Sequence, residues 1–323
     1  MLPLEDAPRS EAVPRPEVTR LLRTAPLLLP LLLIAAWLLI DRRSAYDGAA
    51  LFVAADPWWL LAGVLFTGLG WVSAACVRQG AVPEPLPPGP LLASQFAAGA
   101  ANHVLPASIG AHAVTLRFLQ RQGVPLARAT ASLALYSLVR PVAKTFVLVA
   151  FVVASPGLLH LGDLVPDRRT LFLAAAAMAL GLLTVALLVT FVRPLRGLVR
   201  TALTDVRLLH TRPCRILALW GGAAAAPLLQ ACVIFSVGAA LGLSLSWTQV
   251  AFAFLAASTM AGAVPAPGGI GPVDAALVLA LVAFGTTMGL ATATVVGYRV
   301  LTVWVPLLPG ALVLSELVRR KVL

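Results

Sequence analysis

Two arginines, Arg140 and Arg299, lie inside long apolar segments of the chain. An arginine in a membrane-spanning segment is costly and usually faces a bundle interior or a cavity. Its planar guanidinium can donate two parallel hydrogen bonds to a phosphate group, so both residues are candidate phosphate ligands. Lys144 lies one turn after Arg140 on the same helix face and adds charge to it. The alternatives are snorkelling to the membrane interface or a structural pair with a carboxylate.

One acidic residue, Asp274, lies in the apolar region 247–315. Its carboxylate could neutralise Arg299, cap a helix near its N-terminus, or carry a proton, and the sequence leaves these three roles open. Asn102, His103 and His112 flank the corresponding interruption in the first half. A histidine can titrate near neutral pH, although hydrogen-bonded structural histidines are more common.

Proline and glycine interrupt two apolar regions, 91–119 and 247–285. The interruptions contain Pro106, Gly110, Pro265, Pro267, Gly268, Gly269, Gly271 and Pro272. These residues cannot all lie in regular helix, and backbone freed at membrane depth needs a protein partner or a water-filled cavity. Broken helix ends direct N–H groups and a positive dipole end at that cavity, which favours an anion. The alternative is a packing turn in which glycine lets two helices approach closely.

The two interruptions begin matching series of residues. Each series reads as a broken apolar segment, a glycine turn, a tyrosine and an arginine: residues 105–110, Gly123, Tyr136 and Arg140, then residues 266–271, Gly285, Tyr298 and Arg299. Paired, interrupted apolar segments in corresponding positions indicate the substrate site of a transporter. We therefore predict these substrate-binding residues: Asn102, Pro106, Gly110, Arg140, Lys144, Pro267, Gly268, Gly269, Gly271, Asp274, Tyr298 and Arg299.

Composition defines the elements that must position these residues. The chain of 323 residues is 60% hydrophobic and 11% charged, outside the range of soluble domains, so we predict an all-α polytopic membrane protein. The alternating segments of about 10 residues that form a membrane β-barrel do not occur. The formal charge of +11 lies mainly between apolar runs, where it indicates membrane topology and no nucleic-acid partner. We find no catalytic or metal-binding motif and expect neither an enzyme nor a cofactor.

Six uninterrupted apolar runs are near the length of about 20 residues that a membrane-spanning helix needs. They are Thr24–Ile40, Trp58–Val77, Ala127–Ala154, Leu171–Val192, Ile216–Leu243 and Leu290–Ser315. The arginine-rich region 193–215 and the basic end of the chain favour the cytoplasm. With these anchors, each interrupted region becomes a re-entrant hairpin, and the halves 24–154 and 171–315 form an inverted repeat. The alternative is that proline and glycine only kink ordinary spans.

This arrangement puts both termini in the cytoplasm. We predict a disordered N-terminal segment over residues 1–23, a single transmembrane domain over 24–315, and a basic tail over 316–323. The sequence does not define an oligomeric state.

The second interruption resembles a motif of the lysylphosphatidylglycerol synthase transmembrane, or flippase-like, family. The resemblance rests on Pro267–Gly271, Asp274, Gly285, Tyr298 and Arg299, with Asn102, Pro106, Gly110 and Arg140 as the first-half counterpart. It extends from about Trp58 to Ser315 and implies a lipid translocase in the cytoplasmic membrane. The multiple peptide resistance factors of this family carry a soluble synthase domain that has no counterpart in this sequence, so the resemblance does not imply synthesis.

The sequence departs from that family pattern at two places. Ala111 and His112 follow Gly110, where the family usually has an acidic residue, and Asp274 stands where glutamate is typical. We hypothesise a lipid flippase or scramblase that moves an anionic or phosphate-bearing lipid, either a phospholipid or a polyprenyl phosphate. Two other functions stay open. One is an enzyme or subunit that acts on lipid-linked sugars, with Asp274 and a histidine as its base, and the other is a partner protein that transports nothing.

Overall fold

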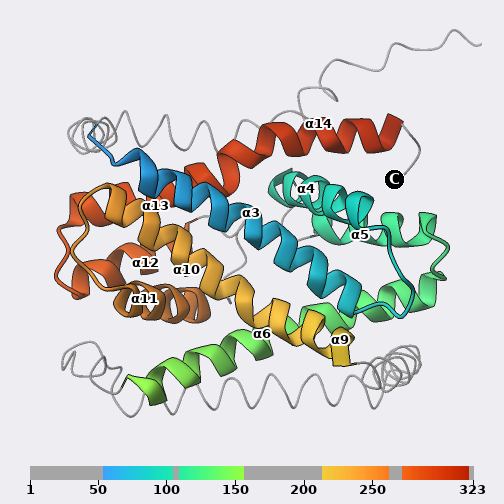
Figure 1. The fold of residues 1–323 in the computed structure, drawn as a ribbon, viewed down its shortest axis with the longest axis horizontal. Helices are drawn as coiled ribbons and strands as arrows, with labels where there is room; N and C mark the ends of the chain where they lie inside the picture. The colour runs from blue at the N-terminus through green and yellow to red at the C-terminus, as the bar shows by residue number, and fades with distance from the viewer. Residues whose placement is uncertain (1–53, 105–108, 156–212, 262–270, 320–323) are drawn as a thin grey trace, which may run out of the picture. The chain divides into compact units, whose positions relative to one another are not determined.

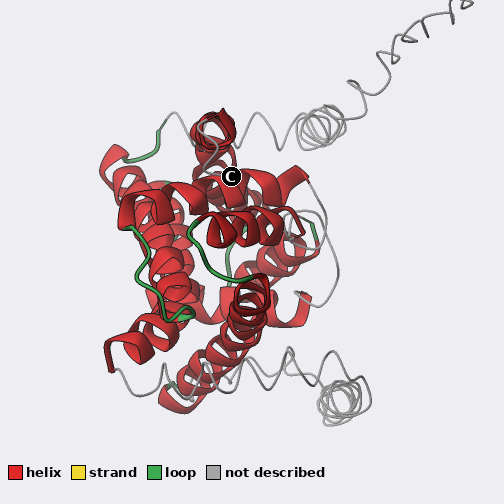
Figure 2. Cartoon of the chain, turned by 90° about the vertical axis from the view of Figure 1, so that its right-hand side faces the viewer, coloured by secondary structure: helices red, strands yellow, loops and turns green. Residues whose placement is uncertain are grey.

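Helices form each stretch of the chain that the computed structural model describes, namely residues 54–104, 109–155, 213–261 and 271–319 (Figure 1). Turns and loops connect the helices, and none of these residues forms a strand (Figure 2). The predicted all-α class is therefore confirmed for this part of the chain. The predicted spans Thr24–Ile40 and Leu171–Val192 lie outside the described residues, as do the segment 1–23 and the last four residues of the tail.

Four described helices are long and apolar enough to cross a membrane, and each overlaps a predicted span. They are α3 (Pro57–Gly80), α6 (Leu126–Ala154), Pro213–Ala240 and Met288–Leu307. The third comprises α9 (Pro213–Ile216), the π-helical turn η3 (Leu217–Gly221) and α10 (Gly222–Ala240). The fourth comprises α13 (Met288–Arg299), the π-helical turn η6 (Val300–Trp304) and the start of α14 (Val305–Arg319).

Two pairs of shorter helices occupy the interrupted regions. Helix α4 (Pro88–Val104) packs against α5 (Ile109–Arg121), and α11 (Trp247–Met260) packs against α12 (Pro272–Ala283). Each has fewer residues than the about 20 that a straight crossing requires. Helix α12 begins directly after Gly271, whose φ of 110° is disfavoured for residues with a side chain. The described residues thus support the predicted break at Gly271, whereas Gly110 lies inside α5 and residues 105–108 and 262–270 lie outside the described part.

The same turn follows the second helix of both pairs. Gly123 and Gly285 have φ angles of 82° and 95°, which glycine adopts without strain. The N–H after each glycine donates to a carbonyl five residues earlier, at 3.0 Å in the first turn and 3.3 Å in the second. This bond, with the one from the glycine N–H, makes a Schellman motif. Helices α6 and α13 both begin three residues after the glycine.

Helices α3 and α10 lie side by side (Figure 1). Small residues allow this approach, since a Cβ at Gly222 would collide with Val77 and the Ser73 hydroxyl donates to the Gly222 carbonyl at 2.8 Å. Four other helix contacts have a counterpart at the matching place in the helix order. The contact α3–α4 corresponds to α10–α11, α4–α5 to α11–α12, α5–α6 to α12–α13, and α4–α14 to α11–α6.

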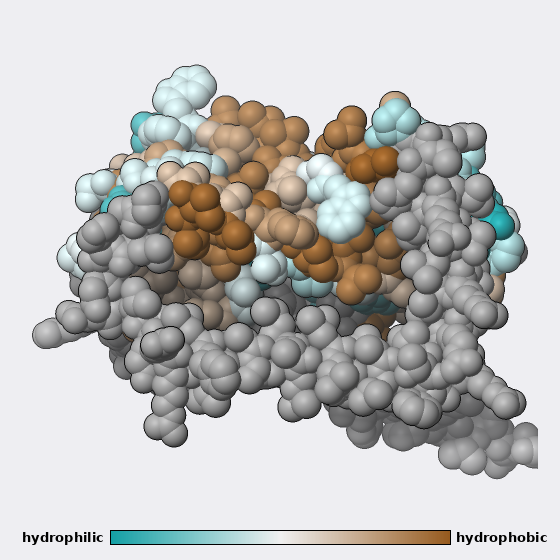
Figure 3. All heavy atoms as spheres, turned by 90° about the horizontal axis from the view of Figure 1, so that it is seen from below, coloured by the Kyte–Doolittle hydropathy of each residue, from teal (hydrophilic) through white to brown (hydrophobic). Residues whose placement is uncertain are grey.

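Apolar side chains cover much of the described surface on the face shown in Figure 3. Large exposed hydrophobic residues recur along α3 and α6, among them Trp58, Leu65, Leu138 and Phe146. Extended apolar surface of this kind indicates contact with a membrane or with another protein.

Candidate functional site

Arg140 is the central residue of α6, with fourteen helical residues on each side of it. At 1.5 Å per residue, it lies about 21 Å from both helix ends. If α6 crosses a hydrocarbon core about 30 Å thick, Arg140 must lie at least about 9 Å below either surface. The residue is nevertheless exposed. Snorkelling does not account for a charge at this depth, so Arg140 needs a polar path or an anion beside it.

Tyr136, one turn before Arg140, contacts two guanidinium groups. Arg140 Nη1 donates to Tyr136 Oη at 2.7 Å, and the Arg140 guanidinium carbon lies 5.3 Å from the ring centroid. Arg78 of α3 stacks more closely, with its guanidinium carbon 3.8 Å from the same centroid. Attraction between a cation and the face of the ring favours each contact alone. Two cations on one ring also repel each other, so another interaction must offset this repulsion.

Arg78 lies near the end of α3 with only 6% of its surface exposed. Its Nε and Nη1 atoms are buried and have no hydrogen-bond partner. Buried polar groups normally find partners, and an unmet donor on a charged group is especially costly. The Nε and Nη1 donors of Arg78 therefore have no acceptor among the described residues.

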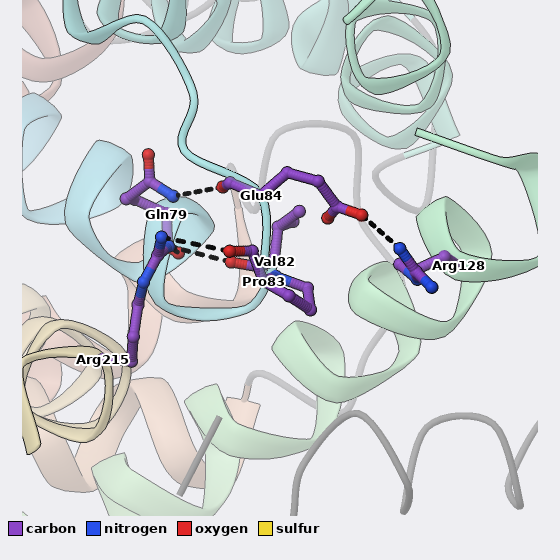
Figure 4. A network of polar contacts seen from close by, with 6 residues as sticks. All are labelled: Gln79, Val82, Pro83, Glu84, Arg128 and Arg215. Atoms are coloured by element: carbon purple, nitrogen blue, oxygen red, sulfur yellow. Dashed lines mark hydrogen bonds and ion pairs between the residues drawn. The ribbon is translucent and has the colours of Figure 1, made fainter. Parts of the chain in front are cut away.

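A network of polar contacts fixes the chain directly after Arg78 (Figure 4). Arg215 of α9 donates to three backbone carbonyls there, those of Gln79, Val82 and Pro83. In the same loop, Glu84 pairs with Arg128 of α6. These contacts tie the end of α3 to both α9 and α6, so the position of Arg78 beside Tyr136 is set by neighbouring helices.

The four acidic residues of the described part all have partners elsewhere. Glu84 pairs with Arg128, Asp274 with Arg299, and Glu316 with Arg319, while Asp56 accepts from the Trp58 N–H at the start of α3. None of these carboxylates pairs with Arg78, Arg140 or Lys144. We call these three residues, arranged around and beyond Tyr136, the cationic cluster. Because its charges have one sign and lie partly buried, an anion would be strongly favoured there.

Lys144 extends the cationic cluster by one turn of α6, about 6 Å beyond Arg140. Its Nζ donates to the Ser258 carbonyl at 2.8 Å and to Ser258 Oγ at 3.2 Å. Ser258 lies in the last turn of α11, where carbonyls lack helical partners and a cation is favourable. Lys144 thus connects the cationic cluster to the first helix of the second pair.

Asp274 performs two of the three roles that the sequence left open. Its Oδ1 accepts from Arg299 Nε at 2.7 Å and lies 2.7 Å from Nη2 of the same residue. Its Oδ2 accepts from the Gly271 N–H at 3.1 Å, at the start of α12. The side chains of Arg299 and Asp274 are only 15% and 17% exposed. Arg299 is therefore paired with a carboxylate, which is the structural alternative stated above.

The chain matches the protein family described as lysylphosphatidylglycerol synthase TM region over residues 20–310. The chain belongs to this family. No curated protein matches it. Together, the family and the four apolar helices identify a multi-pass membrane protein with a lipid-related function. The resemblance drawn from the interrupted segments is confirmed.

In this member of the lysylphosphatidylglycerol synthase TM region family, a second polar contact occupies the position that corresponds to the ion pair. His112 Nε2 lies 3.2 Å from Ser137 Oγ and joins α5 to α6, as Asp274 and Arg299 join α12 to α13. Asp274 follows His112 by 162 positions, and Arg299 follows Ser137 by the same number. The two turn glycines and the two tyrosines share this offset. At this offset Arg299 is matched in position by Ser137, whereas the motif comparison above pairs it with Arg140.

The other predicted site residues have different surroundings. Gly110 is buried in the first turn of α5, where a Cβ would overlap the Ala101 carbonyl, so it lets α4 and α5 approach closely. Tyr298 is buried and packs edge-on against Phe254. Asn102, in the last turn of α4, has a buried Oδ1 without a hydrogen-bond partner. Four predicted residues lie outside the described part: Pro106, Pro267, Gly268 and Gly269.

Sequence reasoning missed Arg78, because the predicted span Trp58–Val77 ended one residue before it. A signal was present, since the apolar Ala81 and Val82 follow closely and indicate that the buried segment continues. The local sequence does not indicate that other elements cover Arg78. Gly80 lets η3 pack closely against the end of α3, because a Cβ at Gly80 would collide with the backbone of Leu219 in η3.

Proposed function

We propose that this chain is a lipid translocase, a flippase or scramblase, for a lipid with an anionic or phosphate-bearing head group. The main support is the cationic cluster of Arg78 on α3 and of Arg140 and Lys144 on α6, which includes a charge at membrane depth and has no carboxylate partner in the described residues. Charges inside a membrane protein are costly and usually mark a substrate or ion pathway. Membership of a family named for a lipid synthase makes a lipid the natural substrate class.

The proposed route follows one face of α6. Tyr136, Arg140 and Lys144 are spaced by one helical turn, so successive polar groups are about 6 Å apart along the axis. A head group could pass from one to the next while its acyl chains stay in the bilayer. The contact of Lys144 with Ser258 puts the second helix pair at one end of this series. In the second half, we propose that the Asp274–Arg299 pair and Tyr298 line the same route.

The proposal includes an inverted repeat, which would supply two related conformations open to opposite membrane faces. Three observations support it: the shared glycine turn, the shared offset between polar contacts, and the recurring helix contacts. We propose that both short helix pairs are re-entrant hairpins in a single transmembrane domain over residues 24–315. Both termini would be cytoplasmic, and the protein would lie in the cell membrane.

We further propose that the chain is not an enzyme. An enzyme acting on lipid-linked sugars would need an available base, and the candidates are Asp274, His103 and His112. The structure describes the side chains of Asp274 and His112. Asp274 already holds Arg299 and the Gly271 N–H, and His112 contacts Ser137. Both Asp274 oxygens and the His112 ring thus already have partners within the protein, which weighs against the enzymatic alternative.

Lipid movement in proteoliposomes tests the function directly. Labelled phosphatidylglycerol, phosphatidylcholine and a polyprenyl phosphate would be assayed with the wild type, Arg140→Gln and the control Arg319→Gln. Arg319 is exposed and lies outside the cationic cluster. We expect head-group-selective movement that falls at least about tenfold in Arg140→Gln, the effect of about 1.4 kcal/mol, and is unchanged in the control. Absence of movement for all three lipids, or equal rates in Arg140→Gln and wild type, would contradict the proposal.

A further inference from the structure

We propose that Arg78, Tyr136 and Arg140 form a binding site for the phosphate group of a lipid, with Arg78 as its buried anchor. The inference rests on the proposed function for the source of the phosphate. The site itself is inferred from the geometry around Tyr136, and it assigns a role to a residue that the sequence motifs did not include.

The donors at this site exceed the acceptors that the protein supplies. Arg78 offers Nε and Nη1, both buried without a partner. Arg140 spends one guanidinium nitrogen on Tyr136 Oη and has further N–H groups to donate. Because Tyr136 Oη accepts that bond, its own proton remains to be donated. Two guanidinium groups and one hydroxyl around the same ring thus keep donors that an acceptor-rich group could use.

The charges at this site also require an acceptor that is negative. The guanidinium carbons of Arg78 and Arg140 lie 3.8 Å and 5.3 Å from the centroid of the same ring, so they are at most about 9 Å apart, less than the Debye length of about 10 Å in 0.1 M salt. Burial of Arg78 reduces the screening of their repulsion further. A bound anion would replace this repulsion with two attractive pairs.

Phosphate fits this site better than a single carboxylate does. A phosphate group offers several strong acceptor oxygens in a tetrahedral arrangement and can accept from both arginines and the hydroxyl together. Arginine is also the preferred residue for phosphate, because its guanidinium stays charged and is weakly hydrated. The site therefore recognises the feature that phospholipids and polyprenyl phosphates share.

The position of Arg78 suggests where along the route this site lies. Arg78 is two residues from the end of α3, whereas Arg140 is at the centre of α6. A phosphate held between them would lie between a membrane surface and the middle of α6. Lys144 is about 12 Å further along α6 from Tyr136. The site is thus the outermost described position of the series, where a head group would enter or leave.

Ligand titration of the purified full chain in detergent micelles tests this inference. The probes are dioctanoyl phosphatidylglycerol, farnesyl phosphate, and dioctanoylglycerol, which has no phosphate, with binding measured by isothermal titration calorimetry. We expect the wild type to bind at least one phosphate lipid about tenfold or more tightly than dioctanoylglycerol. The preference between the two phosphate lipids identifies which lipid class, phospholipid or polyprenyl phosphate, supplies the bound phosphate group. A wild type that does not favour phosphate overturns the inference without any variant.

Variants then test the role of Arg78. Arg78→Gln should weaken binding of the preferred phosphate lipid at least about tenfold, and Arg78→Lys less, because an ammonium keeps the charge but loses the planar fork. Arg117→Gln is the matched control, since Arg117 is an exposed arginine on α5 outside the cluster. Equal affinities for Arg78→Gln and Arg117→Gln would overturn the inference. If lipid transport persists while the preference for phosphate lipids is absent, only the phosphate site is overturned. If the protein binds phosphate lipids selectively but transports none, only the proposed translocase function is overturned.

Discussion

The ion pair between Asp274 and Arg299 allows the cost of a substitution to be worked out from the structure. Removing one partner of a buried pair costs about 3 to 5 kcal/mol, because the other charge stays buried without compensation. The side chains keep 15% and 17% of their surface exposed, so we take the lower value of about 3 kcal/mol. Loss of the acceptor for the Gly271 N–H adds about 1 kcal/mol. Asp274→Ala should therefore lower the free energy of unfolding by about 4 kcal/mol.

Unfolding with increasing SDS in mixed micelles, followed by tryptophan fluorescence, measures this difference. Asp274→Asn keeps an acceptor for the Gly271 N–H but loses the charge, so its cost should be about 1 kcal/mol smaller. Adding Arg299→Gln to Asp274→Ala removes the stranded charge and should restore about 2 kcal/mol. Ser137→Ala is the control, because it removes the side-chain contact with His112, and a typical hydrogen bond of this kind is worth about 1 kcal/mol.

Two results would refute this reasoning. A loss for Asp274→Ala no larger than that for Ser137→Ala would mean that the ion pair contributes no more than a neutral contact. A loss that shrinks strongly when the salt concentration rises to about 1 M would mean that solvent screens the pair, because a buried pair is screened much less.

Two further predictions concern the backbone around the site. Gly271→Ala forces a side chain into a φ of 110° and should cost about 1 to 3 kcal/mol in the same unfolding assay. Gly289→Ala, in ordinary helix with open space around it, should be neutral or slightly stabilising, and equal effects would contradict the argument. Arg215→Gln removes the donors to three carbonyls at and just after the end of α3, so amide hydrogen exchange over residues 79–87 should rise at least about tenfold. Unchanged exchange there would mean that other contacts hold this loop.

The described spans could be predicted because a long apolar run has few other stable forms in a membrane. The predicted span Ala127–Ala154 differs from α6 by one residue at its start. The predicted span Ile216–Leu243 begins three residues after the helix Pro213–Ala240 begins and ends three residues after it ends. Helix ends depend on caps and loop contacts, which hydrophobicity alone does not report.

The site could be predicted only in part. Asp274 and Arg299 are 25 positions apart across a glycine turn, and two charges in one apolar region have few other partners. Arg78 and Tyr136 are 58 positions apart and meet only because α3 packs beside α6. No local spacing announces that contact. The correspondence between His112 and Asp274 is also hidden, because the offset is shared but the residue types differ.

The two halves of the chain differ in whether their buried positive charges have a carboxylate partner. This difference bears on how a translocase could work. The Asp274 carboxylate neutralises Arg299, whereas the cationic cluster of the first half has no carboxylate partner in the described residues. An anion therefore gains more in the first half. An anion that reached Lys144 would compete with the Ser258 carbonyl for its Nζ and would loosen the end of α11 from α6. Occupancy of the first half would then bias the position of the second helix pair, which is the differential interaction that a ligand-driven change between two conformations requires.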